Sequence, residues 1–389
     1  MASAHLFALD LRHRSLLALS LAIGLSFGLA WLAYVLVEQP VRRRPLSAPF
    51  QWGLSLAALA VTWTGIDALA HTYRGKFFLG SGVDSVPKLE KIDEHRPVIV
   101  GTDISDASCS VANWLPYNIK NRTDFSRCRK AGRAGAREIF LLGDSHAHHL
   151  LPMLDLVTNK TGQSISFTFK TICLISPDIT VSFDNKPYEP CRQFAAGEID
   201  RAIQRLKPND IVLVSTWLNK QLADIDGSGR PLELIVYING EVSTPFQVRA
   251  AYIASSRRIA KKLAAKGIQL VLVVDIPILV REPAACEAWS KLFSDQERST
   301  LCSPPAAITA EMQNTLRNTL AQVAKGLPNV HIFDPTDQLL FAGRVQHRRP
   351  DGTLQYADSH HLSYSGSKGL AEGFQRFLNN QGLTGGNTR

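Results

Sequence analysis

Beyond residue 134 the chain alternates short apolar runs with segments of helical periodicity, and this alternation constrains the fold more than any other feature. The apolar runs have the length of strands, and the segments between them repeat their apolar residues at helical spacing. Such alternation predicts an α/β domain with a doubly wound parallel sheet and helices on both faces. Strands are predicted at 137–142, 164–170, 210–216, 268–275 and 329–333, and helices near 147–158, 195–206, 246–266, 307–325 and 364–379.

The first predicted strand runs into Gly143-Asp144-Ser145-His146-Ala147, which places a serine at a strand-to-helix turn. Open α/β sheets bind their ligands at the carboxyl ends of the strands, so Ser145 is predicted to face the ligand. The following helix would direct its N-terminal N–H groups toward negative charge that forms there. Asp144 is interpreted as a residue that caps this helix and shapes the loop, because aspartate is a preferred N-cap.

A serine hydroxyl is a poor nucleophile at neutral pH, so it needs a neighbouring base that is oriented by a carboxylate. The late segment from Asp358 to His361 supplies both groups. Ser145, His361 and Asp358 are therefore predicted to carry an acyl transfer, either to water or to another hydroxyl. The alternative is an α/β-hydrolase elbow, because residues 143–147 are one residue short of G-x-S-x-G. In that fold the acid usually comes from a separate strand well before the histidine, and the close spacing of Asp358 and His361 disfavours it.

Gly-Asp-Ser-His with a distal Asp-x-x-His-Leu-Ser resembles the SGNH (GDSL-like) hydrolase superfamily. More narrowly, it is similar to the periplasmic SGNH domain fused to membrane O-acyltransferases of acyltransferase family 3. The resemblance covers the chain from about Ala134 to the C-terminus and implies a sheet of the SGNH-hydrolase type. It implies that Ser145 is the nucleophile, with Asp358 and His361 as its acid and base. The family's nucleophile turn corresponds to Gly143 and Asp144.

The oxyanion hole departs from the family pattern. The family's second block offers a glycine and its third a Gly-x-Asn, but the segments 171–173 and 215–219 contain neither. Trp217 resembles the fused acyltransferase subgroup, in which a tryptophan is common at this strand end. The backbone N–H of Ser145 is the first candidate for an oxyanion donor and Asn219 is the second. Losing one good donor costs on the order of a hundredfold or more in rate.

Histidines gather near both halves of the predicted site and raise the alternative of a metal centre. Most histidines in such runs are exposed to solvent or support the reacting groups without binding a metal. No cysteine or carboxylate stands at the spacing of zinc ligands. The sequence therefore predicts no metal and no other cofactor. The histidines concerned are His146, His148, His149, His360 and His361.

The first seventy residues are far more apolar than the remainder, and two segments predict transmembrane helices. Residues 15–37 carry no charge and are long enough to cross about 30 Å of hydrocarbon. Residues 50–69 form a weaker span, for which a buried amphipathic helix is the alternative. Three arginines between the spans, Arg42 to Arg44, predict a cytoplasmic loop, with both chain ends on the other side of the membrane.

All six cysteines follow the second predicted span, as expected for a domain in an oxidising compartment. Their even number and the lack of a C-x-x-C pair suit a disulfide framework. Sequence neighbours are the natural partners, among the 15 connectivities that six cysteines allow. The sequence therefore predicts an inner (plasma) membrane protein with its catalytic domain on the periplasmic, extracytoplasmic side. The candidates are Cys109, Cys128, Cys173, Cys191, Cys286 and Cys302.

These features divide the chain into a membrane anchor at 1–70, a linker and extension at 71–133, and an SGNH-type catalytic domain at 134–389. Residues 38–43, after an apolar helix, resemble the C-terminal end of the acyltransferase-3 membrane domain. The remainder of that many-helix domain is missing from this sequence. The resemblance therefore implies a fragment, or a product that works with a membrane partner which delivers the acyl donor.

The net charge of +9 suits an anionic glycan only as weak evidence, because part of it lies in the predicted cytoplasmic loop. No helix-turn-helix, zinc-finger or RNA-binding signature is present, so nucleic acid is not an expected partner. The sequence predicts an O-acyltransferase, by resemblance an O-acetyltransferase, that modifies a cell-surface polysaccharide or glycolipid. The alternatives are a carbohydrate acetyl esterase with the same triad and a non-catalytic glycan-binding domain.

Overall fold

The computed structural model describes residues 128–183, 186–222, 235–280, 283, 286 and 302–384, with a few isolated positions before residue 65. The chain divides into two compact units, Met1–Phe78 and Leu79–Arg389, and the second contains the sheet. Apart from those isolated positions, the predicted spans 15–37 and 50–69 and most of the predicted linker lie outside the described residues. Among the residues that are described, no helix has both the length and the apolarity to cross a membrane.

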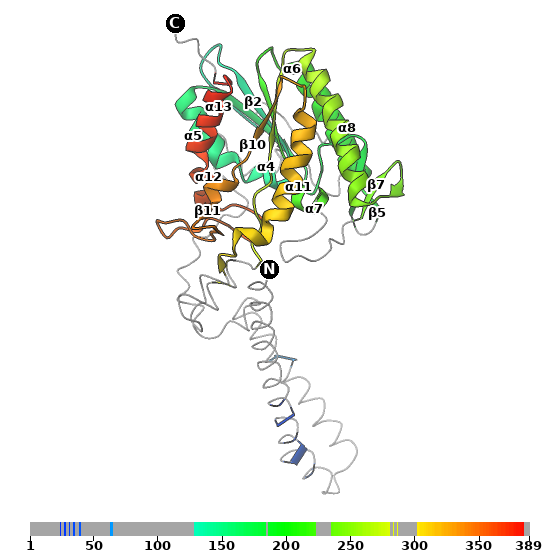
Figure 1. The fold of residues 1–389 in the computed structure, drawn as a ribbon, viewed down its shortest axis with the longest axis vertical. Coiled ribbons are helices and arrows are strands. Elements are labelled where there is room, and N and C mark those ends of the chain that lie inside the picture. The colour runs from blue at the N-terminus through cyan, green and yellow to red at the C-terminus, as the bar shows by residue number, and fades with distance from the viewer. Residues whose placement is uncertain are drawn as a thin grey trace. The chain divides into compact units, whose positions relative to one another are not determined.

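A six-stranded sheet lies at the centre of the second unit (Figure 1). Its strand order is β1-β3-β2-β6-β9-β10, and all neighbours are parallel except β1 and β3. The chain moves outward in opposite directions from the adjacent strands β2 and β6, so ligands are expected at the carboxyl ends of these two strands. The strands are β1 (Arg129–Lys130), β2 (Glu138–Gly143), β3 (Ser164–Phe169), β6 (Ile211–Ser215), β9 (Gln269–Val273) and β10 (Val330–Phe333).

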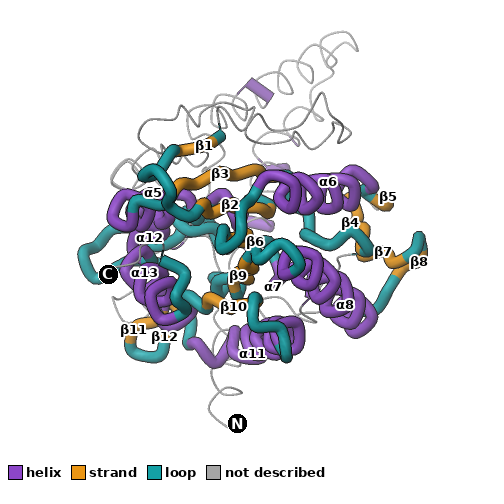
Figure 2. Tube along the Cα trace, turned by 90° about the horizontal axis from the view of Figure 1, so that it is seen from above, coloured by secondary structure: helices purple, strands orange, loops and turns teal. Residues whose placement is uncertain are grey.

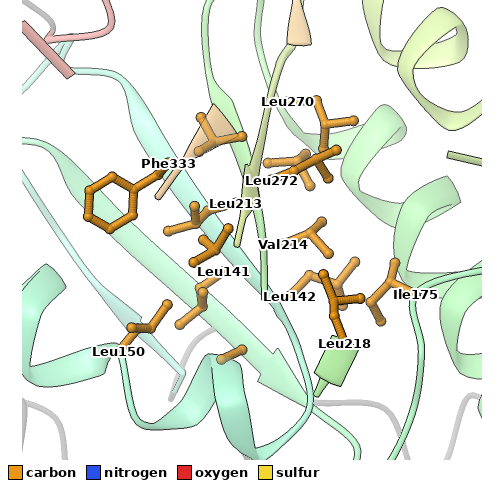
Figure 3. Close-up of a cluster of buried hydrophobic side chains, with 14 of the residues drawn as sticks. Leu141, Leu142, Leu150, Ile175, Leu213, Val214, Leu218, Leu270, Leu272 and Phe333 are labelled. Atoms are coloured by element: carbon orange, nitrogen blue, oxygen red, sulfur yellow. The ribbon is translucent and has the colours of Figure 1, made fainter. Parts of the chain in front are cut away.

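The central strands are apolar on both sides because both faces of the sheet are covered. Every residue of β2, β3 and β6 is buried. Figure 3 shows that Leu141 and Leu142, neighbours on β2, point to opposite faces of the sheet. Leu141 lies with Leu213 and Leu150 on one face, while Leu142 lies with Val214 on the other. Burial on both faces explains why uninterrupted apolar runs predict these strands.

Helices form a layer on each face of the sheet (Figure 2). Helices α5, α12 and α13 contact one another on one face, and α6, α8 and α11 lie on the other, where α8 contacts both α6 and α11. The helices are α4 (Ser145–His148), α5 (Leu151–Thr161), α6 (Glu189–Arg205), α7 (Leu218–Leu222), α8 (Pro245–Ala264), α11 (Ala306–Ala324), α12 (Tyr364–Gly369) and α13 (Ala371–Asn380).

Two smaller sheets lie outside these layers. A four-stranded antiparallel sheet has the order β5-β4-β7-β8, and a hairpin pairs β11 with β12. A short 3₁₀ helix, η6 (Thr336–Leu339), precedes the hairpin. The strands are β4 (Ile179–Phe183), β5 (Lys186–Pro187), β7 (Val236–Ile238), β8 (Glu241–Val242), β11 (Leu340–Phe341) and β12 (Arg344–Val345).

The five predicted strands are confirmed, and the α/β architecture with them. The helix predicted at 147–158 is two helices, because α4 ends at His148 and α5 begins again with Pro152 in its first turn. The helix predicted at 364–379 is likewise divided at Leu370, which ends α12 and precedes α13. The strands outside the central sheet were not predicted individually. Most of them are two or three residues long and too short to show a periodicity, whereas β4 is as long as β6 and was missed.

Disulfides join Cys173 to Cys191 and Cys286 to Cys302, so pairing between sequence neighbours is confirmed for these four cysteines. Cys128 is also disulfide-bonded, and its partner lies outside the described residues. The first of these bonds ties the turn after β3 to the first turn of α6. Closing a loop of this length stabilises a fold by about 3 kcal/mol in the chain-entropy treatment.

Candidate active site

Ser145 is the first residue of α4 and follows the carboxyl end of β2. The helix is capped by Asp144, whose Oδ1 accepts a hydrogen bond from the backbone N–H of His146 at 2.8 Å. The Asp144 Oδ2 accepts from the backbone N–H of Trp217 at 3.0 Å. One buried carboxylate therefore joins the turn after β2 to the turn after β6, the two central strands of the sheet.

The shape of this turn depends on Gly143 and on the burial of Asp144. A Cβ atom at Gly143 would lie 1.7 Å from the carbonyl oxygen of Ser215, so only glycine permits β2 and β6 to approach this closely. Asp144 is fully buried. Burial raises the pKa of Asp144 to about 7, although the backbone N–H groups of Trp217 and His146 act in the opposite direction. The carboxyl group shapes the turn and has no surface for contacting a substrate.

The structure brings together the three residues predicted to act as nucleophile, base and acid. Ser145 Oγ lies 2.8 Å from His361 Nε2, and His361 Nδ1 lies 2.6 Å from Asp358 Oδ2. A proton on Nδ1 donates to the carboxylate and leaves Nε2 free to accept the serine proton. The His361 side chain is 23% exposed and that of Asp358 is 37% exposed, so a substrate can reach them.

The loop that carries Asp358 and His361 is held by the segment after β9. Tyr356 is fully buried and its hydroxyl donates to the carbonyl of Pro277 at 2.7 Å. The backbone N–H of Leu279 donates to the carbonyl of Ser359 at 2.7 Å. These two bonds fix the loop on either side of Asp358, and they hold its side chain at the edge of the sheet.

Local hydrogen bonds keep Asp358 ionised. Its Oδ1 accepts from the backbone N–H of His360 at 2.8 Å and from that of His361 at 2.6 Å. Partial burial by itself raises the pKa of Asp358, but the hydrogen bond and charge of His361 outweigh it and hold the pKa well below its usual range. A carboxylate in this position can orient the His361 ring and stabilise its protonated form.

Trp217 and His360 form a stacked pair of rings beside the triad. Their rings stack with centroids 4.1 Å apart and an interplanar angle of 7°. The ammonium group of Lys220 lies 4.6 Å from the centroid of the Trp217 ring on the same turn. Partial burial and the charge of neighbouring His361 lower the pKa of His360 to about 4, so this imidazole is neutral at physiological pH.

Asn219 lies in the interior, where it connects the turn after β6 to the segment after β9. Its backbone N–H donates to Asp275 Oδ2 at 2.9 Å, and its side-chain amide donates to the carbonyl of Ile276 at 2.7 Å. Only 1% of the residue is exposed. The structure therefore places the two predicted oxyanion candidates differently, with Ser145 at the start of α4 and Asn219 bonded within the fold.

The structure also reveals a second histidine–aspartate pair that the sequence analysis missed. His146 Nδ1 lies 2.6 Å from Asp275 Oδ1, and both side chains are at most 1% exposed. Burial raises the pKa of Asp275 to about 7 and holds the pKa of His146 well below its usual value. The signal available in the sequence was a single carboxylate at the end of the predicted strand 268–275, where it reaches the same edge of the sheet as Ser145.

The fold and the site define a class of protein: an SGNH-type α/β domain whose triad implies esterase or acyltransferase chemistry. The chain belongs to the family described as "SGNH domain (fused to AT3 domains)", which matches residues 109–376. No curated protein matches the chain.

Several solved structures are similar to this chain at low sequence identity. The periplasmic domain of a lipopolysaccharide acetyltransferase from Salmonella ser. Paratyphi A is 15% identical, with a TM-score of 0.48, over 78% of this chain and 100% of that chain. A catalytic mutant of an acetylxylan esterase from Geobacillus stearothermophilus is 14% identical, with a TM-score of 0.34, over 65% of this chain and 98% of that chain. A GDSL-like lipase from Bacteroides thetaiotaomicron is 11% identical, with a TM-score of 0.34, over 64% of this chain and 87% of that chain. The family match, rather than these likenesses, assigns the chain.

Proposed function

We propose that the chain is an O-acyltransferase module, specifically an O-acetyltransferase, that modifies a cell-surface polysaccharide or glycolipid. The observation that carries this proposal is the unbroken set of hydrogen bonds from Ser145 Oγ through His361 to Asp358. Membership of a family described as fused to AT3 domains favours transfer to a sugar hydroxyl over hydrolysis. Acetyl is the acyl group that the family implies.

In the first half of the reaction, Ser145 Oγ attacks the carbonyl carbon of the acyl donor while His361 Nε2 takes the hydroxyl proton. The tetrahedral intermediate collapses to an acyl-serine ester, and His361 returns the proton to the leaving group of the donor. In the second half, His361 takes the proton of a sugar hydroxyl, whose oxygen attacks the ester. Collapse of that intermediate releases the acylated sugar and restores the serine hydroxyl.

The negative charge of each tetrahedral intermediate needs hydrogen-bond donors. The backbone N–H of Ser145 is the first donor in this mechanism, because the first N–H groups of a helix have no acceptor within the helix. Asp358 remains a carboxylate and stabilises the imidazolium that forms in each half of the reaction. Gly143 and Asp144 position the serine without contacting the substrate.

The acyl donor reaches the site through a membrane acyltransferase domain or a partner subunit, and the chain is anchored in the inner membrane with this domain in the periplasm. Two disulfides in the described residues support an oxidising compartment. The family description supports the link to a membrane acyltransferase. The acceptor is a glycan, and neither nucleic acid nor a cofactor takes part in this mechanism.

The test measures acyl release and acyl transfer by the full chain, with a chromogenic acetyl ester as donor, in the presence and absence of a sugar acceptor. Ser145→Ala is the test variant, and Ser243→Ala, on an exposed loop, is the matched control. Serine-dependent acetylation of the sugar supports the transferase. Serine-dependent release of acetate alone would show a carbohydrate acetyl esterase. If the folded chain shows no serine-dependent turnover but binds the glycan, the domain is a binding module.

A further inference from the structure

Three imidazoles converge at the active site, although they come from segments more than two hundred residues apart in the sequence. His146, His360 and His361 each offer a ring nitrogen, and these nitrogens all lie within 4.8 Å of one another. The ring centroids are 4.1 Å apart for His360 and His361, 4.9 Å for His146 and His361, and 5.7 Å for His146 and His360. Among the described residues, these three side chains form a group whose ligand atoms are close enough together to hold a metal ion.

Two of the three rings form a hydrogen bond from Nδ1 to a carboxylate, and the Nδ1 of the third lies near one. His146 Nδ1 lies 2.6 Å from Asp275 Oδ1, and His361 Nδ1 lies 2.6 Å from Asp358 Oδ2. His360 Nδ1 lies 3.3 Å from Asp358 Oδ1, and its hydrogen-bond contact is with Ser359 Oγ at 3.4 Å. Metal-binding histidines have this arrangement, in which the carboxylate fixes the tautomer and leaves the lone pair of the other nitrogen free. Nε2 is therefore the nitrogen that the rings of His146 and His361 present to a ligand.

The Nε2 atom of His146 is an independent observation that points to a ligand position. It is buried, and it has no hydrogen-bond partner among the described residues. The residue itself is 0% exposed. A buried polar atom without a partner destabilises the fold, and an ion is one of the explanations for such an atom in a native fold.

We propose that Nε2 of His146, His360 and His361 form a binding site for a divalent transition metal ion of the zinc type, and that the ion inhibits the enzyme. Three imidazole nitrogens with one open position are a donor set that zinc accepts, at Zn–N distances of about 2.0–2.1 Å. The inhibitory effect rests on the proposed function, whereas the binding does not.

Inhibition follows from the position of His361. Its Nε2 lone pair lies 2.8 Å from Ser145 Oγ, where it accepts the serine proton. A metal ion that takes this lone pair removes the base from Ser145, and no proton has to leave the ring because Nδ1 carries it. The His360 and His361 side chains are 22% and 23% exposed, which gives the ion a route to the site. The ion competes with the reaction and is not a cofactor of it.

Direct binding is the first test. The full chain, purified through a tag without histidine and freed of metal with a chelator, is titrated with Zn²⁺ by calorimetry and with Co²⁺ by visible absorption. We expect one equivalent of tightly bound metal and a Co²⁺ spectrum of tetrahedral nitrogen ligation. His360→Gln should weaken binding at least tenfold. His331→Gln is the control, because His331 bonds to Gln269 and Gln381, away from this site.

Two further variants separate the metal site from the catalytic proposal. His146→Gln tests the buried ligand. If the His146→Gln protein does not fold, His360→Gln still tests whether the histidines bind the metal. Ser145→Ala should retain metal binding, whatever the activity of the chain proves to be. In an active enzyme, Zn²⁺ should inhibit ester cleavage, and His360→Gln should need at least tenfold more Zn²⁺ for the same fractional inhibition. Absence of binding by the wild-type chain, or equal binding by wild type and His360→Gln, would overturn the proposal.

Discussion

Two histidine–aspartate pairs meet at the active site, and the same two side-chain types have different surroundings in each. In the pair of His361 and Asp358, the histidine is 23% exposed and Nε2 reaches the serine hydroxyl. In the pair of His146 and Asp275, both side chains are at most 1% exposed, and Nε2 has no partner among the described residues. The Nδ1-to-carboxylate distance is 2.6 Å in both pairs.

The two pairs have the same hydrogen-bond distance, so they differ in burial rather than in hydrogen-bond geometry. Asp358 keeps its pKa well below the usual range because backbone and imidazole donors outweigh its partial burial. Burial raises the pKa of Asp275 to about 7, despite donors from the backbone of Asn219 and Ile276. In the proposed mechanism, the first pair exchanges protons with a substrate. The second is placed to hold the turn that carries Ser145.

The largest expected effect comes from removing the exposed histidine. His361→Ala removes the base for both halves of the reaction, and we expect kcat/KM to fall on the order of 10⁴–10⁶-fold. Turnover of a chromogenic acetyl ester measures this loss. His331→Ala is the control, because that residue lies outside the site and should leave the rate unchanged. Retention of a tenth of the wild-type rate by His361→Ala would exclude it as the base.

The exposed carboxylate should have the next largest effect. Asp358→Asn retains the shape of the side chain but loses the charge that holds the proton on His361 Nδ1. We expect a loss on the order of 10³–10⁴-fold in kcat, because the ring can adopt the wrong tautomer. Asp351→Asn is the matched control, since Asp351 is exposed and bonds only within its own turn and to Arg349. A loss below tenfold would place the orienting acid elsewhere.

The buried carboxylate should affect stability more than rate. Asp275 accepts from His146, Asn219 and Ile276, and an asparagine has a single oxygen for these three donors. We expect Asp275→Asn to lower the free energy of unfolding by about 1–3 kcal/mol. Urea unfolding measures this change, and ester turnover of the same samples measures the rate.

The two aspartate variants together test the comparison between the pairs. Asp275→Asn should lose less activity than Asp358→Asn when both proteins are fully folded. A full loss of activity with unchanged stability would show that Asp275 takes part in the chemistry. The exposed control Asp351→Asn should change neither quantity.

The sequence predicted the central sheet and the exposed pair because both have local signals. Runs such as 137–142 are buried on both faces, and their apolar character marks them directly. Asp358 and His361 are three residues apart, so a short motif contains both. The relation between Ser145 and that motif was inferred from what a serine nucleophile requires and from family resemblance, because no local pattern joins positions so distant in the chain.

The buried pair could not be predicted in this way. His146 and Asp275 are 129 residues apart and meet only because β2 and β9 lie on either side of β6. The same reason explains why the sequence did not predict the contact of Asn219, a candidate oxyanion donor whose amide donates to the carbonyl of Ile276. Contacts across the edge of a sheet depend on the order of the strands, and a single sequence does not show which residues that order brings together.

The smallest expected effect concerns the ring of Trp217, which stacks on His360. Trp217 stacks on His360 at 4.1 Å, and its ring lies 5.4 Å from that of His146, so it touches the surroundings of both pairs. Trp217→Leu keeps the backbone N–H that binds Asp144 and removes only the aromatic contacts. We expect a loss of about 0.5–1.5 kcal/mol in unfolding free energy and a fall of a few-fold in kcat.

Trp217→Phe is the matched variant for this last prediction, because it retains a ring that can stack on His360. Its rate should lie closer to wild type than that of Trp217→Leu, and urea unfolding should rank the three proteins in the same order. If both variants lose activity a hundredfold with wild-type stability, the indole itself acts on the substrate. The comparison of the two histidine–aspartate pairs would then have to include Trp217 as a residue that acts in the reaction.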